Sequence, residues 1–520
     1  MKNNKVDVLI VGAGPAGAAA AWNLSKTNLN IACFEQGPNL SKKEFDEKSE
    51  NYESLKLSKF NVNPNIRKLI SDYPINDKKS QISVSNFNAV GGSTVLYSAH
   101  VPRFHSSDFK ANSLDGVGSD WPLNYKDLKK YYELNEKMMS VAGLIGDPAY
   151  PEIKKLSPPV KLDFAGEVMA KAFNKLKWHW WPSYSGINTS KIKKRNKDSI
   201  TTANNSYWPM ALKNGVKLFP NHRVAKIKLD KLGKATGVIY FDEKNIERFQ
   251  EASIVILACS GIGTPRLLLN SSNKSYPNGL ANSSGLVGKN LMLHPLGFVE
   301  GKFKNFLSSN RGPSGCCIYS HQFYKTSLKN NFKRGYTIQV LRGAAPLETA
   351  ISLNKFKELN FGKKFHDNFF ENYGHKISLA IICEDLPEKQ NYISLDRNSR
   401  DSNGIPGVKI NYKLSENSKH MLSDGLKKGK MLMKKAQAIN IKAFGPVKHT
   451  GWHIMGTAKM GLDKKTSVVN EFGQSHDVKN LVILDSSIFT TSSAVNPVAT
   501  ITALALKISD NIKNKSHLFK

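Results

Sequence analysis

The stretch VDVLIVGAGPAG, residues 6–17, decides the fold class of this chain. Its first half is almost wholly apolar and rich in β-branched residues, which predicts a strand buried inside a parallel sheet. Its second half is a glycine turn of the form GxGxxG, and the alanine-rich stretch 18–26 predicts a helix directly after it. A second short strand is expected at Ile31–Phe34. Together these segments form one β-α-β unit, so the sequence predicts an α/β fold.

A glycine turn between a strand and a helix typically binds the pyrophosphate of a dinucleotide. Gly12 allows the tight turn, Gly14 lets a phosphate approach the backbone, and Gly17 lets the helix pack on the strand. Glu35 lies 18 residues after Gly17, where a carboxylate accepts hydrogen bonds from ribose hydroxyls. The turn residues expected to contact the cofactor are Gly12, Gly14, Pro15, Ala16 and Gly17. The motif alone does not separate NAD from FAD.

The rest of the chain predicts a Rossmann-like domain interrupted by a second domain. Buried strands are expected at Ser253–Ala258 and Leu481–Leu484, and helices at Tyr125–Ala142 and from Pro497 to about 512. Between about 298 and 445 the pattern changes to short strands joined by Pro, Gly and Asn turns, which is typical of an antiparallel sheet. The strands expected there are Ile377–Cys383, Asn391–Leu395 and Val408–Tyr412.

We therefore expect the dinucleotide-binding domain to comprise residues 1–297 and 446–520. A substrate domain built on an antiparallel sheet is expected at 298–445. Residues 41–80 are charged and are expected to be irregular. Apart from the helix expected at Tyr125–Ala142, residues 105–200 form a cap or loop region that the pattern assigns poorly.

The formal net charge of +33 does not by itself indicate nucleic-acid binding. Nucleic-acid binders gather Lys and Arg on one element, often beside aromatic residues, whereas here the lysines are spread along the chain. The densest run, residues 191–197, contains no aromatic residue. We expect no nucleic-acid partner, although a basic surface is able to steer an anionic substrate or an acidic electron acceptor.

The cysteines and the N-terminus predict a cytoplasmic protein. The five cysteines form no CxxC pair, and the polar segment Met1–Lys5 runs into the first strand with no signal-peptide cleavage site. These features favour reduced thiols and no structural metal site. No apolar run reaches the roughly 20 residues of a membrane-spanning helix. Peripheral association with a membrane stays open.

Four more motifs follow the glycine turn in a fixed order. They are VGGSTVLY at 90–97, SGIGTPRLLLNS at 260–271, GLVGKNL at 285–291 and HIMGTAKMG at 453–461. Asp485 and the pair Asn496-Pro497 come after them. In this order the motifs resemble the glucose–methanol–choline (GMC) oxidoreductases, a flavoprotein family, over nearly the whole chain.

The resemblance implies FAD as cofactor and assigns roles to single residues. Gly91, Gly92 and Ser93 match the loop that passes along the pyrophosphate and the flavin, and Val224 matches a residue whose backbone touches the adenine. Asp485 matches the aspartate near the ribityl chain and pyrophosphate. Three further residues match positions at the reacting centre. His453 matches the catalytic histidine, Asn496 matches the His or Asn opposite it, and Pro497 matches the start of the last helix.

These residue types suit the oxidation of an alcohol to a carbonyl compound. A neutral imidazole at His453 is a natural base for the hydroxyl proton. The amide of Asn496 is able to hydrogen-bond the same oxygen and help to place the substrate. Asn followed by Pro is also a favoured helix start, so Asn496 has a second possible role as a cap. The positive end of that helix would stabilise an anionic reduced flavin.

Departures from the family pattern bear on the cofactor linkage and the substrate. Leu96 stands where some members carry the histidine that binds FAD covalently, so FAD is expected to be non-covalent. The motifs are similar to the sugar and sugar-acid dehydrogenase or pyranose-oxidase-like branch. The expected substrate is an alcohol, polyol, sugar or sugar acid, and the electron acceptor (oxygen, a quinone or a cytochrome) stays open.

Other readings of the same residues remain. A flavin-dependent lyase or decarboxylase of the same fold is one alternative, and a non-enzymatic basic binding protein is another. Of the 13 histidines, several are interpreted as structural or surface residues: His222, His294, His321 and His449. Trp452 and the cluster Trp178, Trp180 and Trp181 are candidates for a sugar site, although packing is the favoured interpretation.

Overall fold

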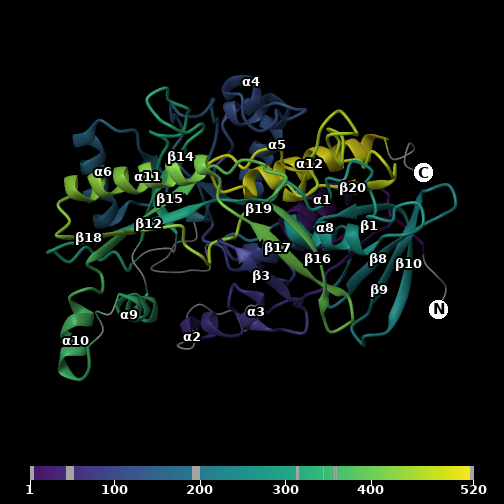
Figure 1. Cartoon of the computed structure of the whole chain (residues 1–520), viewed down its shortest axis with the longest axis horizontal. Coiled ribbons are helices and arrows are strands. Elements are labelled where there is room, and N and C mark those ends of the chain that lie inside the picture. Colours follow the sequence, from purple (N-terminus) through teal and green to yellow (C-terminus); the bar gives the residue numbers. More distant parts are fainter. Residues whose placement is uncertain are drawn as a thin grey trace.

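The computed structural model describes residues 5–41, 52–189, 200–311, 315–342, 345–356, 358 and 360–515. Residues 1–4 and the basic run 191–197 lie outside these ranges. Two sheets lie towards opposite ends of the long axis of the molecule (Figure 1). One is the sheet predicted from the glycine turn, and the other is built from the middle of the chain.

The first sheet is centred on β1 (Val6–Val11), which is fully apolar except for Asp7. Parallel partners flank it on both sides: β2 (Ile31–Phe34) and the long strand β10 (Glu247–Leu257). The sheet continues in parallel with β7 (Lys217–Phe219) beside β2 and with β20 (Leu481–Ile483) beside β10. The predicted α/β fold is confirmed.

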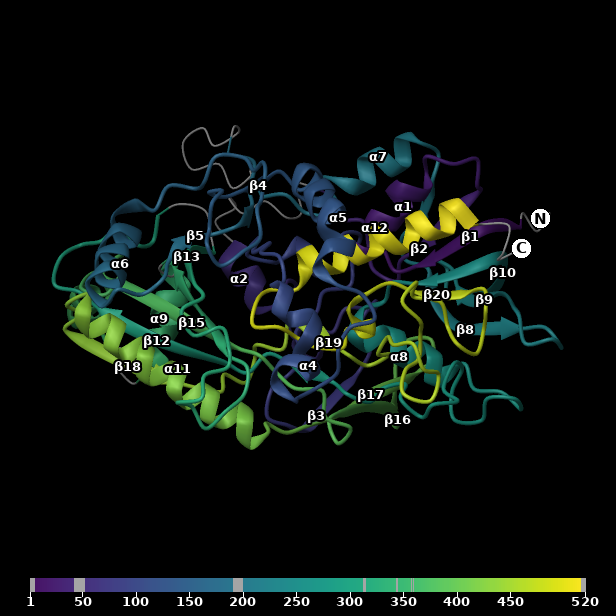
Figure 2. The same ribbon diagram turned by 90° about the horizontal axis from the view of Figure 1, so that it is seen from above.

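Strand β10 also belongs to an antiparallel extension of this sheet. Its first half pairs with β9 (Ala235–Phe241), which pairs in turn with β8 (Arg223–Leu229). Helix α1 (Pro15–Leu24) packs against α12 (Val498–Lys515), and α5 (Tyr125–Met138) lies against α12 (Figure 2). The first and last helices of the chain thus cover the same part of the sheet.

The second sheet has six strands, and every neighbouring pair in it is antiparallel. In spatial order the strands are β18 (Asn440–Phe444), β12 (Leu296–Lys302), β15 (Lys376–Cys383), β14 (Tyr336–Leu341), β13 (Cys316–Ser320) and β5 (Trp181–Pro182). Helix α11 (Glu416–Lys435) lies on it, and α6 (Asp163–Leu176) contacts α11. The glycines of α11 allow a close approach, because a Cβ at Gly425 would lie 2.4 Å from Ile381 Cγ2.

A hairpin from the middle of the chain lies outside the six-stranded sheet. Strands β16 (Tyr392–Arg400) and β17 (Pro406–Tyr412) are antiparallel as expected, but β17 pairs in parallel with β3 (Ile75–Ser80). Both strands of the hairpin contact α8 (Ser260–Asn270). The expectation that 41–80 is irregular is therefore wrong at β3 and at two short helices over 52–57 and 64–67; residues 42–51 of this range lie outside the described residues. The division into 1–297, 298–445 and 446–520 stays a prediction.

The remaining elements are short and mostly connect these parts. They are α2 (Tyr52–Leu57), α3 (Pro64–Arg67), α4 (Ala111–Asp115), β4 (Val141–Ala142), β6 (Ser185–Gly186), α7 (Tyr207–Lys213), β11 (Met292–Leu293), α9 (Pro346–Lys355), α10 (Lys363–Phe370), β19 (Ile454–Met455) and the 3-10 turns Gly92–Val95, Ser106–Lys110 and Ser486–Ile488. In the described part of the chain, no helix has the length and apolar character needed to cross a membrane.

Candidate active site

The glycine turn is packed so tightly that side chains are excluded from it. Gly12 has φ +103°, and a Cβ there would lie 2.5 Å from the carbonyl oxygen of Ala258. A Cβ at Gly17 would lie 2.0 Å from the carbonyl oxygen of Gly12. Gly14 has no side chain to cap α1, which leaves the positive end of this helix available to an anion.

The second glycine loop lies directly against the first. The amide of Gly91 donates to the carbonyl oxygen of Ala13 at 2.9 Å. A Cβ at Gly92 would lie 2.9 Å from Gly14 Cα. Both Gly91 and Gly92 have positive φ, a conformation that glycine adopts at no steric cost. The structure thus brings together the two loops that the sequence predicts to hold one dinucleotide.

Glu35 fastens the glycine turn to the end of β2. Its Oε2 accepts from the amide of Ala13 at 2.9 Å, and its Oε1 accepts from the amide of Gly37 at 2.8 Å. Burial raises the pKa of Glu35 to about 7, although these backbone hydrogen bonds oppose the rise. Each oxygen keeps a further lone pair, which leaves Glu35 able to accept from a ribose hydroxyl as well.

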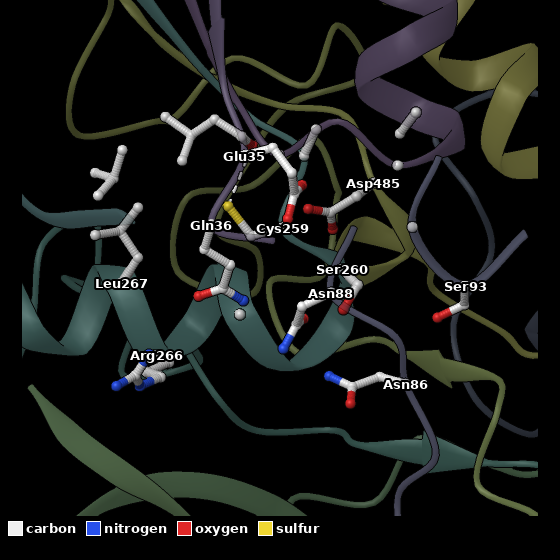
Figure 3. Close-up of a pocket in the computed structure, with 18 of the residues that line it drawn as sticks. Glu35, Gln36, Asn86, Asn88, Ser93, Cys259, Ser260, Arg266, Leu267 and Asp485 are labelled. Atoms are coloured by element: carbon white, nitrogen blue, oxygen red, sulfur yellow. Dashed lines mark hydrogen bonds between the residues drawn. The ribbon is translucent and has the colours of Figure 1, made fainter. Parts of the chain in front are cut away.

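One pocket collects most of the predicted cofactor residues (Figure 3). It is lined by Gly12, Gly14, Pro15, Ala16, Glu35, Gly92, Ser93, Val224 and Asp485. Asp485 is held in its wall by the amide of Ser487 at 2.8 Å and by Thr264 Oγ1 at 2.5 Å. Four of the predicted cofactor residues lie outside the lining: Gly17, Gly91, Asn496 and Pro497.

Several residues of the pocket wall were not predicted from the sequence. Gln36, Asn86, Asn88 and Arg266 line it (Figure 3); of these only Arg266 lies within a quoted motif, residues 260–271, and no role was assigned to it. Asn86 is 6% exposed, and among the described residues no group hydrogen-bonds its side-chain oxygen. A buried carboxamide oxygen without a partner, in a glycine-lined pocket, fits a site that is completed by a polar ligand such as FAD.

The predicted base is carried by a two-stranded sheet of four residues. β11 and β19 are antiparallel, with Leu293 opposite Ile454. His294 follows β11 and His453 precedes β19, so the two imidazoles meet at the same end. Their Nδ1 atoms are 2.8 Å apart. The interpretation of His294 as merely structural missed this contact, because 159 residues separate the two positions and no spacing rule connects them.

Backbone carbonyls determine which nitrogen of His453 carries the proton. His294 Nε2 lies 2.9 Å from the carbonyl oxygen of Ser493 and 3.2 Å from that of Ser492, so it must be the protonated nitrogen of that ring. The Nδ1 of a neutral His294 is then an acceptor, and His453 Nδ1 must donate to it. This network therefore assigns the lone pair of His453 to Nε2.

Both imidazoles are held in the neutral form. Burial lowers the pKa of His294 to about 4. Burial is also the main reason that the pKa of His453 falls well below 6.5, and the neighbouring His294 and His100 lower it further. A neutral imidazole with a free lone pair is the state in which a histidine acts as a base.

Asn496 lies opposite that lone pair, as predicted. Its Nδ2 is 3.4 Å from His453 Nε2, and its Oδ1 accepts from Gln339 Nε2 at 2.7 Å. Helix α12 begins at Val498 and not at Pro497, so Asn496 lies two residues before the first helical residue. Its side-chain hydrogen bonds run to His453 and Gln339, which favours the role at the reacting centre over the cap.

The tryptophans are divided between packing and the pocket. Trp178 and Trp180 pack against the core of the six-stranded sheet, and the Trp181 ring nitrogen donates to the carbonyl oxygen of Leu144 at 2.8 Å. Trp452 lines the cofactor pocket.

Among the residues that the structure describes, no group of three or more His, Cys, Asp and Glu side chains is arranged to hold a metal ion.

Known proteins are similar to this chain over almost its full length. Two family models, both described as GMC oxidoreductase, match residues 6–296 and 387–505 respectively. The chain is 35% identical to a 2-methyl-1,2-propanediol dehydrogenase of Mycolicibacterium austroafricanum, covering 98% of this chain and 96% of the relative. It is 25% identical to a fructose dehydrogenase large subunit of Gluconobacter japonicus, covering 98% of each. The solved structure of pyridoxine 4-oxidase from Mesorbium loti matches with a TM-score of 0.67 at 15% identity, covering 99% of each chain.

Proposed function

Because the chain belongs to the GMC oxidoreductase family, we propose that His453 is the base and Asn496 the hydrogen-bond donor of its reaction. The protein is an FAD-dependent oxidoreductase that acts on CH–OH groups. The observation that carries the proposal is the unprotonated Nε2 of His453, which faces Asn496 Nδ2 at 3.4 Å. That contact is long for a hydrogen bond, and a substrate hydroxyl placed there would bond to both groups.

His453 and Asn496, on either side of the substrate hydroxyl, would then activate the alcohol together. The hydroxyl proton passes to His453 Nε2, while Asn496 Nδ2 donates to the oxygen as negative charge develops on it. FAD, when bound, accepts the hydrogen and the electron pair that leave the carbinol carbon. The C–O bond becomes a carbonyl. His453 then carries a proton on both nitrogens, and its Nδ1–H still donates to the lone pair of His294, which stabilises the cation.

The same residues support binding of FAD without a covalent bond. The two glycine loops, Glu35 and Asp485 would hold the dinucleotide, and Val224 would contact its adenine. Asn86 offers an unused acceptor to the bound cofactor. Leu96 has only carbon atoms in its side chain and packs beside Phe60 and Phe87.

We propose a small vicinal diol, oxidised at a primary hydroxyl, as the substrate class. The relative at 35% identity is a 2-methyl-1,2-propanediol dehydrogenase. In that diol only one carbinol carbon bears hydrogen, so oxidation by hydride removal has one possible product, a hydroxyaldehyde. A sugar is the second candidate, because a fructose dehydrogenase large subunit is 25% identical.

Two further expectations belong with this proposal. A cytoplasmic location is supported by the thiols, since all five cysteines are free in the structure. The electron acceptor is proposed to be a separate small molecule or protein that oxidises the flavin after the alcohol has left.

Anaerobic mixing of the FAD-loaded enzyme with 2-methyl-1,2-propanediol or D-fructose tests the proposal. We expect the diol to bleach the flavin absorbance and D-fructose to do so more slowly. His453→Ala should retain FAD but slow the bleaching by about 10²–10⁴-fold, the usual contribution of a positioned acid–base group. High pH should partly rescue this variant, because a pre-formed alkoxide needs no base.

The matched control is His449→Ala, since His449 is exposed four residues before His453; its rate should equal that of the wild type. Because burial keeps the pKa of His453 below 6.5, the wild-type rate should fall only at pH values more acidic than that. A wild-type rate in His453→Ala would show that His453 is not the base. Turnover without flavin bleaching would favour a lyase.

A further inference from the structure

The orientation of the Asn496 carboxamide is fixed from outside the catalytic pair. Gln339, on β14, donates from Nε2 to Asn496 Oδ1 at 2.7 Å. On its other side Asn496 faces the lone pair of His453 Nε2, which accepts only a donor. The two neighbours therefore demand the same orientation independently, with the Asn496 N–H groups towards His453 and the carbonyl oxygen towards Gln339.

A buried histidine, His100, lies near this pair. The amide of Cys316 donates to His100 Nε2 at 3.0 Å, so a neutral His100 carries its proton on Nδ1. Burial lowers the pKa of His100 to about 4, and the side chains of Gln339 and Asn496 oppose this fall.

Four side chains form one hydrogen-bonded series with a single direction. It runs from Gln339 Nε2 through Asn496, His453 and His294 to the carbonyls of Ser492 and Ser493. A backbone C=O only accepts. That end of the series cannot reverse, so each side chain from His294 back to Gln339 has one favoured orientation.

From this arrangement we infer that Gln339 is a positioning residue, which keeps an N–H of Asn496 and not its carbonyl oxygen against the reacting oxygen of the substrate. The inference rests on the proposed function, in which that N–H stabilises the developing negative charge. A reversed Asn496 would set its Oδ1 against both the substrate oxygen and the His453 lone pair. The single proton of the substrate hydroxyl could then serve only one of these two acceptors, and no donor would face the negative charge that develops on the oxygen.

Two substitutions of Gln339 separate a directional role from a purely structural one. Gln339→Leu keeps most of the volume and removes the donor at every pH. Gln339→Glu keeps the shape, but its carboxylate only accepts, so Asn496 must turn its NH₂ group away from the substrate. At acidic pH the buried carboxyl group regains a proton and with it the ability to donate to Asn496 Oδ1.

We expect Gln339→Leu to slow anaerobic flavin bleaching by 2-methyl-1,2-propanediol about 10- to 100-fold, less than the loss of a whole oxyanion donor. In Gln339→Glu the loss should be similar at alkaline pH and should shrink as the pH falls, opposite to the trend of the wild type. FAD content and the flavin spectrum should not change, because Gln339 lies outside the lining of the cofactor pocket. Gln437→Glu, at an exposed position, is the matched control.

Nuclear magnetic resonance of ¹⁵N-labelled histidine provides a readout that does not depend on turnover. The His453 signals should show a proton on Nδ1 and none on Nε2, and Gln339→Leu should keep this tautomer, because His294 sets it. Wild-type bleaching rates for both Gln339 variants across the pH range would overturn the inference. So would a Gln339→Glu rate that falls in parallel with the wild type towards acid. If these results came with a slow His453→Ala variant, the proposed function would still stand.

Discussion

Glu35 has a structural role in the fold and a proposed role in cofactor binding. The sequence predicts a ribose contact from its position after β2, and the structure adds that both its oxygens hold backbone amides of the surrounding loops. Because burial raises its pKa to about 7, the side chain changes its charge near neutral pH. Only the ionised form accepts with every lone pair, so ribose hydroxyls should favour it.

FAD affinity should therefore depend on pH through Glu35. Binding favours the carboxylate, so the dissociation constant of FAD from the apoprotein should fall as the pH rises through about 7. Glu35→Gln should bind FAD more weakly and should lack this pH dependence. Fluorescence titration of FAD at pH 6, 7 and 8 (about one pH unit on either side of that pKa) measures both effects. Equal affinity and an equal pH slope in the variant would exclude Glu35 from the ribose site.

At this scale the sequence predicts groups that belong to motifs and misses the groups that orient them. His453 and Asn496 were recognisable because each stands in a segment with a characteristic pattern. Gln339 lies in an ordinary strand, and His294 was interpreted as structural. Their roles depend on which side chains meet after folding across separations of 157 and 159 residues, which no local pattern encodes.

Among the elements, those with a strong local signal were predicted best. β1, the glycine turn and β2 are consecutive, and their hydrophobic pattern alone predicts the β-α-β unit. β3 was missed because its sequence INDKKS is charged and only its two ends are buried. Its partner β17 is more than 300 residues away, so the pairing depends on the whole fold.

Helix α11 offers a prediction about packing. A Cβ at Gly425 would lie 2.4 Å from Ile381 Cγ2 of the sheet, so Gly425→Ala forces the helix away from β15. Overpacking of this kind costs about 1–3 kcal/mol, whereas Ala in place of Gly gains about 0.5–1 kcal/mol of helix propensity. The thermal midpoint should fall. Ser423→Ala, at an exposed position of the same helix, should leave it unchanged or raise it, and an unchanged midpoint for Gly425→Ala would contradict the packing argument.

For the molecule as a whole, the sequence predicts an α/β part interrupted by an antiparallel sheet, and both sheets are present. What it does not predict is how the second sheet contributes to the reacting centre. Gln339 reaches the proposed centre from β14, Asn496 from the segment before α12, and His453 from the position just before β19. The pocket and the proposed catalytic pair are therefore products of the assembled molecule.

A prediction for the whole molecule is that the purified protein holds FAD without a covalent bond. Leu96 has no atom able to bond to the flavin, so acid precipitation should release all the FAD into the supernatant. The measurement is the flavin absorbance of the supernatant and of the pellet. Yellow colour that stays with the precipitated protein would show that a residue other than Leu96 forms a covalent link.

The order of strands in the first sheet has a consequence for biosynthesis. β1 and β10 are neighbours, but β20 completes the sheet beside β10 only when residues 481–483 have been made. The ribosome adds about 220 residues between the end of β10 at Leu257 and the start of β20 at Leu481, which at about 5–20 residues per second takes roughly 10 to 45 seconds. During that interval the nascent chain exposes an unpaired edge of β10 and lacks Asp485 and Asn496. Capture of the flavin is thus expected after release from the ribosome, and a chain that stops before residue 453 should be catalytically inert however well its first half has folded.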